Sequence, residues 1–463
     1  MNIKIVTRIL CLLTASVCLS VQATLETDER ILAAAAKALP LIENASAVSL
    51  KERSCYTCHN GGASVFAIEA SRTRGLAIDK DNFLDQLQRA YTDLRSIARR
   101  AQPGAFAPGQ ADGAGWKLLT LAQAGWPRDE NTDSAVQFLI DYNRNIDHWT
   151  WSQVTRPPTV GSEFTSTWAA LAGLREYAAP KVSISVALRT AECKGWLLRT
   201  ESIDTEDSVS KLRSLRIIGA NPSDIGAEAK KLLRNQRTDG GWSQLNRGES
   251  DAYATSTALI GLYETGQLEH DAPESRRALN YLLESQLEDG SWHVVKRAPE
   301  LQPHYESSFP HERDQFISAV ATSWAVYAML QTIPKTLDGS FLATLPNRKN
   351  EVEIDYREQM FSESEIAFFR DEIEPVLIES CYKCHSQDAK KLKADLYLDS
   401  RDGILFGGDN GPAILPGEPE GSLLIDALTA NGIDEMPPKK GPLSSETIAL
   451  FEQWIKMGAP HDR

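Results

Sequence analysis

Apolar residues recur at helical spacing through most of the chain. Between residues 30 and 335, many segments place apolar side chains at positions i, i+3, i+4 and i+7, which predicts amphipathic helices. Gly, Pro, Asn and Asp separate these segments, and the alternation typical of β-strands is scarce. We therefore expect a mainly α protein built of helical hairpins. The predicted helices cover residues 31–41, 83–100, 134–142, 167–177, 227–235, 255–264, 275–284 and 319–330.

The first 23 residues have a different pattern. Lys4 and Arg8 precede an apolar run over 9–21, and Val21-Gln22-Ala23 offers small residues where a signal peptidase cuts. This pattern predicts a Sec signal peptide over 1–23 and an exported, periplasmic protein, because the run is too short to span a bilayer. No later stretch reaches 18 apolar residues, so we expect no transmembrane segment in the mature chain. A retained N-terminal anchor is the alternative.

The helical pattern stops after residue 335. Residues 336–362 are polar and read as a linker. A new unit over 363–463 begins with an amphipathic helix over 364–377 and ends with a second one over 444–457. The predicted organisation is therefore a helical domain over 24–335, the linker, and a small helical domain over 363–463.

The cysteines carry the clearest chemical signal. The chain has seven, of which Cys11 and Cys18 fall in the predicted signal peptide, and the odd number left argues against a pure disulfide framework. Four of the others form Cys55-Tyr56-Thr57-Cys58-His59 and Cys381-Tyr382-Lys383-Cys384-His385. In this motif the two thiols bond covalently to haem and the His binds its iron. A zinc site or a redox disulfide is the alternative, but structural zinc prefers four ligands at tight spacing.

The order of elements in the C-terminal unit resembles a class I cytochrome c. A helix, the second Cys-x-x-Cys-His motif, a Gly- and Pro-rich stretch, Met436-Pro437-Pro438 and a closing helix follow one another. The strings Gly407-Gly408 and Pro416-Gly417 are similar to the cytochrome c modules common in planctomycete-type bacteria. The resemblance implies haem c on Cys381 and Cys384, His385 as the proximal iron ligand and Met436 as the distal ligand. It also implies helices that cross near Phe369 and Trp454.

The distal ligand of the first predicted haem is less clear. No Met lies between Met1 and Met329, so a local Met ligand is absent. The distal ligand must be a His or another side chain, unless the position is open. We favour His311 and His148. The remaining candidates before the linker are His270, His293 and His304.

Two units in the helical region repeat at an offset of 50 residues. Gln236 to Trp242 and Gln286 to Trp292 share the pattern Q-x-x-x-G-x-W, and a helix rich in small residues follows each. The stretch through His148-Trp149 echoes the pattern. These units resemble the QW motifs of the squalene–hopene cyclase and prenyltransferase superfamily. The resemblance implies an α/α toroid, and it concerns the fold more than the chemistry.

Charge and motifs leave three candidate functions. The formal net charge of −14 argues against nucleic-acid binding, because phosphate contacts need clustered Lys and Arg. The first candidate is electron transfer by two covalent haems to redox partner proteins. The second is a terpenoid cyclase, whose nearest acidic cluster is Asp204-Thr205-Glu206-Asp207. Glu206 replaces the central Asp of the cyclase pattern, and the cluster reads rather as a helix N-terminus. The third is a scaffold that binds a small apolar or aromatic ligand.

Overall fold

The computed structural model divides into two compact units, Met1–Thr344 and Leu345–Arg463, and each is described by itself. The described residues are 3–53, 56–99, 110–150, 156–298, 304–344, 361–394, 396–406, 413–414, 416–417, 419–429, 436–438 and 443–461. Side chains are described from residue 26 onward, except those of residues 96–99, 402, 405, 406 and 421.

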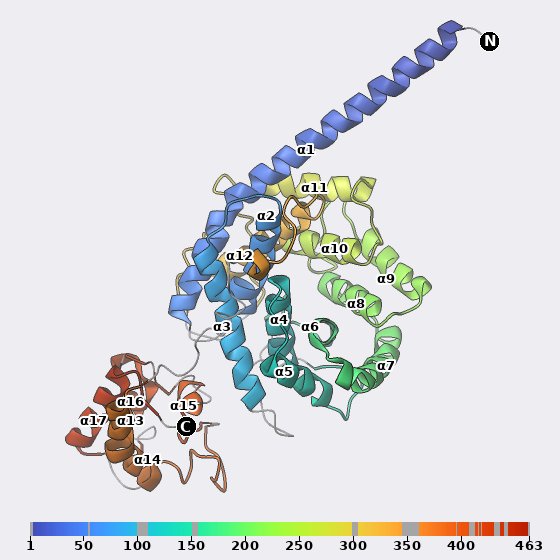
Figure 1. The fold of residues 1–463 in the computed structure, drawn as a ribbon. Coiled ribbons are helices and arrows are strands. Elements are labelled where there is room, and N and C mark those ends of the chain that lie inside the picture. Colours follow the sequence, from blue (N-terminus) through green and yellow to red (C-terminus); the bar gives the residue numbers. More distant parts are fainter. Residues whose placement is uncertain are drawn as a thin grey trace. The chain divides into compact units, whose positions relative to one another are not determined.

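The N-terminal unit is a closed ring of helical hairpins (Figure 1). Each inner helix packs on the next inner helix, and the last packs back on the first, so the ring is complete. Among the described residues the unit contains no strand, only two isolated β-bridges. The predicted α/α toroid is therefore confirmed. The inner helices are α2 (Ser64–Thr73), α4 (Gln110–Gln123), α6 (Glu163–Tyr177), α8 (Thr205–Ile217), α10 (Ala252–Glu264) and α12 (Gln315–Leu330).

A second layer of helices surrounds the ring, and its members are amphipathic because only one face of each is covered. In α9, for example, Ile225, Ala229 and Leu232 are buried at helical spacing while Lys230 and Arg234 alternate with them. The outer helices are α1 (Ile3–Glu52), α3 (Lys80–Arg99), α5 (Glu130–Asp141), α7 (Ser183–Arg199), α9 (Pro222–Arg234) and α11 (Pro273–Ser285).

Three Trp residues join outer to inner helices in the same way. Trp149, Trp242 and Trp292 are each at most 1% exposed. The indole N–H of each donates to the carbonyl ten residues earlier at 2.8–2.9 Å, at the end of the preceding outer helix. The backbone N–H of each donates to a Thr hydroxyl of the following inner helix at 2.9–3.2 Å. The predicted repeat is thus a structural unit, and the stretch through Trp149 belongs to it.

The Gln of each QW unit reaches the next outer helix. Gln236 donates to the carbonyl of Glu274 in α11 at 2.8 Å, and Gln286 donates to the carbonyl of Ala34 in α1 at 2.9 Å. Gly290 has φ +98°, and a Cβ there would lie 2.6 Å from the carbonyl oxygen of Lys37, so only Gly permits this approach. The second QW unit therefore closes the outer layer, because it connects α11 to α1.

Helix α1 contains the predicted signal peptide and continues into the toroid. Its stretch Glu26–Glu52 passes a length and hydropathy test for a membrane span among the described residues. However, 44% of its apolar window is buried, since this stretch packs on α2, α3 and α12. Such burial is expected of an outer-layer helix of a toroid, and the test is weak evidence for a membrane span.

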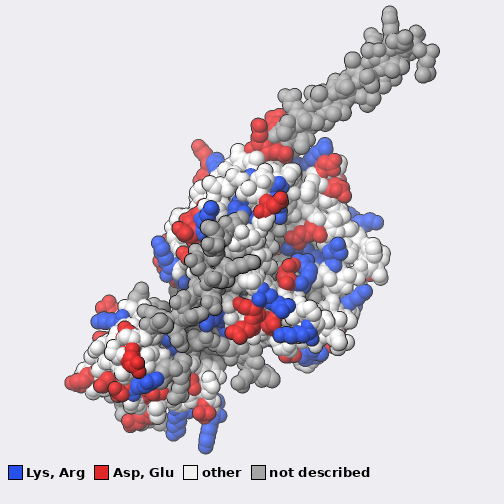
Figure 2. All heavy atoms as spheres, viewed as in Figure 1, with Lys and Arg blue, Asp and Glu red and all other residues white. Residues whose placement is uncertain are grey.

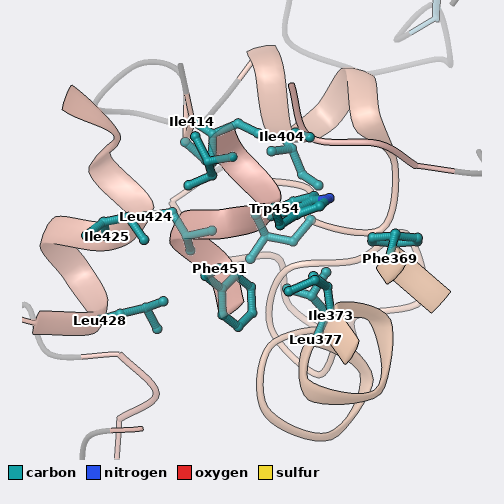
Figure 3. Close-up of a cluster of buried hydrophobic side chains, with 14 residues drawn as sticks. Phe369, Ile373, Leu377, Ile404, Ile414, Leu424, Ile425, Leu428, Phe451 and Trp454 are labelled. Carbon is teal, nitrogen blue, oxygen red and sulfur yellow. The ribbon is translucent and has the colours of Figure 1, made fainter. Parts of the chain in front are cut away.

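The C-terminal unit is a small helical bundle (Figure 3). Phe369 and Trp454 are fully buried and stack with ring centroids 5.9 Å apart, as the cytochrome resemblance implied. The predicted first helix runs on to Ser380, but its middle is a π-helical turn before Pro375, whose missing N–H cannot continue the ladder. The helices are α13 (Glu363–Phe368), the π-helix Phe369–Ile373, α14 (Glu374–Ser380), α15 (Arg401–Phe406), α16 (Leu423–Thr429) and α17 (Ser445–Lys456).

Candidate haem sites

The first Cys-x-x-Cys-His motif enters the ring at the start of α2. Ser54 and Cys55 lie outside the described residues. A π-helix, Cys58–Ala63, continues directly into α2 and contacts α1, α3, α4 and α12. The backbone N–H groups of Gly61 and Gly62 both donate to the carbonyl of Thr57. The motif therefore lies within the packed helices of the toroid.

Tyr56 anchors the motif to two neighbouring helices. Its backbone N–H donates to Oδ2 of Asp93 in α3 at 2.5 Å, and its hydroxyl lies 2.7 Å from Oγ1 of Thr120 in α4. A Cβ on Gly62 would lie 2.3 Å from the Tyr56 hydroxyl, so Gly62 leaves room for this ring. The position of Cys58 is therefore set by contacts on both sides of the residue.

The chemistry around His59 fits a covalent haem. Cys58 is a thiol outside any disulfide, and burial raises its pKa to about 11. Burial, and then the nearby Arg156 and Arg53, lower the pKa of His59 to about 4, so the imidazole is neutral, as iron coordination requires. The buried Nδ1 of His59 has no hydrogen-bond partner. A neutral imidazole, a free thiol and two nearby guanidinium groups are what the iron, a vinyl group and the propionates of a haem would require.

The second motif also combines free thiols with a largely buried imidazole. Cys381 and Cys384 are thiols rather than a disulfide. The backbone N–H of His385 donates to the carbonyl of Cys381 at 3.0 Å, which forms a tight turn directly after α14. His385 is 9% exposed, burial lowers its pKa, and its buried Nδ1 has no hydrogen-bond partner. These residues also fit a haem.

Met436 lies after α16, where its backbone N–H donates to the carbonyl of Ala427 at 2.9 Å. The residues just before it, 430–435, and just after Pro438, 439–442, lie outside the described residues. Its assignment as the distal ligand therefore still rests on the resemblance given above.

The two favoured distal ligands of the first site pack elsewhere. His148 stacks on Trp196 of α7 at 4.3 Å between ring centroids, and its Nδ1 lies 3.0 Å from Asp147. His311 stacks on His293 at 4.6 Å, and its Nε2 lies 2.7 Å from Oγ of Ser291. The ring of His59 instead lies beside Phe316, at the start of α12. No contact of the described residues joins His59 to His148 or to His311.

The acidic residues at the start of α8, Asp204, Glu206 and Asp207, make two different kinds of contact. Asp204 accepts from the backbone N–H of Asp207 at 2.9 Å, and Oδ2 of Asp207 accepts from the N–H of Ile203 at 3.1 Å. The capping interpretation is therefore confirmed for these two residues. Glu206 is not part of the cap: its Oε2 is buried without a hydrogen-bond partner, and its neighbours in the ring include Thr257 and Tyr253 of α10. Burial, and then the charge of Asp204, raise the pKa of Glu206 to about 8.

This pKa predicts a pH-dependent stability. Between the unfolded value, about 4.5, and about 8, folding takes up a proton at Glu206. Stability should therefore fall as pH rises through this window, by at most about 1.4 kcal/mol per pH unit. We expect Glu206→Gln to flatten that slope and to stabilise the toroid at pH 8 more than at pH 5. Urea unfolding followed by circular dichroism from pH 5 to 8 measures it.

Glu201→Gln is the matched control, because Glu201 is exposed and the change removes the same charge. Parallel slopes for the wild type and Glu206→Gln would contradict the prediction.

A small hollow lies where α4, α6, α8 and α10 end. Trp168 and Phe66 give it an aromatic side, and Arg213 lies 3.9 Å above the Trp168 ring while pairing with Glu264 at 2.8 Å. Arg175 and Arg216 also line it. The lining is therefore more cationic than a simple apolar cage.

The described surface charges are mixed. On the face shown in Figure 2, Lys and Arg side chains alternate with Asp and Glu side chains over both units.

Comparisons with known proteins bear on each unit separately. Residues 381–440 match the family model described as Planctomycete cytochrome C. The match begins at Cys381 and extends beyond Met436, so the C-terminal unit carries a cytochrome c domain, and with it covalently bound haem c.

Several solved structures are similar to the toroid at low identity. A type II terpene cyclase, MstE from Scytonema, in complex with geranylgeranyl dihydroxybenzoate is 13% identical, with 65% of this chain and 98% of that chain covered and a TM-score of 0.41. For its apo form the identity is 15%, the coverage 64% and 97%, and the TM-score 0.38. ent-Copalyl diphosphate synthase from Streptomyces platensis is 17% identical, with 59% and 50% covered and a TM-score of 0.39. The ring architecture is shown by the contacts between the helices of this chain.

Proposed function

We propose that this protein is an exported di-haem c-type cytochrome that exchanges electrons with redox partner proteins. One haem is attached to Cys55 and Cys58 with His59 on its iron, and the other to Cys381 and Cys384 with His385 and Met436 on its iron. The observation that carries the proposal is that each motif places a free cysteine beside an imidazole whose lowered pKa keeps it neutral and able to bind iron: Cys58 beside His59, and Cys384 beside His385. The pattern of residues 1–23 supports export.

The chain's own residues would do the following work. The bound haem supplies reversible one-electron chemistry of iron. At the first site, the packed π-helix and Tyr56 would fix the attachment point, while Arg53 and Arg156 would neutralise the propionates. At the second site, Phe369 and Trp454 form the apolar wall of the domain. Low dielectric around an iron is one of the means by which a protein sets its reduction potential.

Counting haems tests the proposal. We expect a pyridine haemochrome assay and intact mass to give two covalent haems per chain in a host with cytochrome c maturation. Cys55→Ala with Cys58→Ala should remove one haem, and Cys381→Ala with Cys384→Ala should remove the other, because both thioether bonds of a site are then lost. Cys193→Ala is the control, since Cys193 is a buried thiol outside both motifs. One haem in the wild-type chain would sink the di-haem proposal.

A second candidate function has one observation in its favour. Oε2 of the half-buried Glu206 is buried, and the raised pKa of this carboxyl keeps it protonated near pH 7, which is the state a general acid needs. Such an acid could start the cyclisation of a terpenoid, or anchor a small ligand with one polar end. His59→Ala should abolish redox turnover but leave cyclisation intact, and Glu206→Gln should do the reverse. Cyclisation lost in Glu206→Gln but kept in His59→Ala would favour the second candidate.

A further inference from the structure

The ring of His59 has an aromatic neighbour that it shares with a second histidine. Phe316, at the start of α12, lies 6.1 Å from His59 and 6.0 Å from His304 between ring centroids. The two imidazoles are therefore at most about 12 Å apart. The other described histidines of the toroid pack on different partners: His148 on Trp196, His270 on Tyr263, and His293 and His311 on each other.

The residue after His304 fixes this segment against the haem motif. The Tyr305 hydroxyl accepts from Nδ2 of Asn60 at 3.3 Å and donates to Oγ of Ser49 at 3.0 Å. Its ring packs 5.0 Å from Phe316, and the Arg53 guanidinium lies 4.7 Å above it. Asn60 directly follows His59, so the side chains of the residues that follow His304 and His59 are hydrogen-bonded to each other.

The hydrogen-bond contacts of the His304 ring are weak enough to be replaced by a bond to iron. Its Nε2 lies 2.8 Å from Oε1 of Glu306 and 3.5 Å from Nε2 of Gln315. The Glu306 side chain is 73% exposed, and ion pairs at such sites contribute at most about 1 kcal/mol. By contrast, His311 interacts with Ser291, which is fully buried. The ion pair of His304 is therefore a weak surface contact that binding to an iron could replace.

We propose that His304 is the distal iron ligand of the haem at Cys58 and His59. This inference rests on the proposed first haem and makes that site bis-histidine, so the first haem relays electrons rather than binding a small molecule. Two imidazole ligands also give a lower reduction potential than the His/Met pair proposed for the C-terminal domain.

Electron paramagnetic resonance of the oxidised full chain tests the ligand. We expect two low-spin haems in the wild type and, in His304→Ala, one of the two haems converted to high spin. Added imidazole should return that haem to low spin. His293→Ala is the matched control, because His293 is an exposed, ion-paired histidine close by in the chain and should leave both haems low-spin.

A pyridine haemochrome count on every sample separates the two proposals. Suppose that every sample contains two haems. If both haems of His304→Ala are low-spin, or if one haem of the wild type is already high-spin, the His304 assignment is overturned and the first haem is not. One haem in the wild type overturns the first haem itself. If His304→Ala does not retain its haem, His304→Met decides: retention of a low-spin haem with a raised potential supports the assignment, and an unchanged potential overturns it.

Discussion

Trp242→Ala should lower the free energy of unfolding of the toroid by about 3–5 kcal/mol, the range for truncating a buried aromatic residue. Trp242 has no exposed surface. Its indole N–H donates to the carbonyl of Leu232 at 2.8 Å, and its removal leaves both a cavity and an unsatisfied buried carbonyl. Urea unfolding followed by far-ultraviolet circular dichroism measures the loss.

Trp292 gives an internal comparison, because it makes the same two kinds of hydrogen bond and is equally buried. We expect Trp292→Ala to cost a similar amount, and Trp242→Phe to cost less because most of the volume is kept. Gln236→Ala should cost about 1 kcal/mol, since it removes hydrogen bonds at a partly buried position. A loss below about 1 kcal/mol for Trp242→Ala would contradict the role given to the QW units.

Hydrophobic periodicity predicted the outer helices better than the inner ones, for a physical reason. A helix covered on one side has an amphipathic pattern, whereas an inner helix of the ring is buried on nearly all sides and loses it. Helix α4 was not predicted: its buried stretch is continuous, and a Cβ on Gly115 would lie 2.4 Å from the Ala169 carbonyl. Gly, which disfavours helices in isolation, is here required for close packing against α6.

The third repeat unit shows the limit of motif reading. Trp149 makes the same hydrogen bonds as the Trp of the two QW units, but neither Gln nor Gly precedes it at the expected positions. Instead, Arg189 of α7 lies 4.5 Å above the Trp149 ring and donates to the carbonyls of Tyr142 and His148. Arg189 thus takes the place of the missing Gln, but it lies 40 residues after Trp149 in the chain. The sequence around Trp149 therefore carries no sign of it.

The covalent part of each candidate site was readable from the sequence, because Cys-x-x-Cys-His is local. The surroundings of His59 were not, since Phe316 and His304 come from the far end of the toroid and meet it only when the ring closes. From the sequence, Glu206 was interpreted, like Asp204 and Asp207, as part of a helix N-terminus. Successive residues of a helix point about 100° apart, so Asp207 accepts from the N–H of Ile203, before the cap, while Glu206 lies beside Thr257 of α10.

Met436→His should lower the reduction potential of the C-terminal haem by a sizeable part of the roughly 0.8 V range that axial ligands control. A thioether sulfur stabilises ferrous iron, and His/Met ligation therefore raises the potential relative to two histidines. The oxidised protein should also lose its sulfur-to-iron charge-transfer absorption. Potentiometric titration of the full chain reports both haems, so the first haem serves as the reference.

Met457→Leu is the matched control, because Met457 lies at the end of the closing helix α17 and is likewise only partly buried. Its potential and its charge-transfer absorption should equal those of the wild type. If Met436→His leaves both unchanged, another residue is the distal ligand and the cytochrome resemblance fails at this position. If both variants lower the potential equally, the effect comes from loosened packing around the domain core, since Met457 adjoins Trp454 and Ile455 along α17.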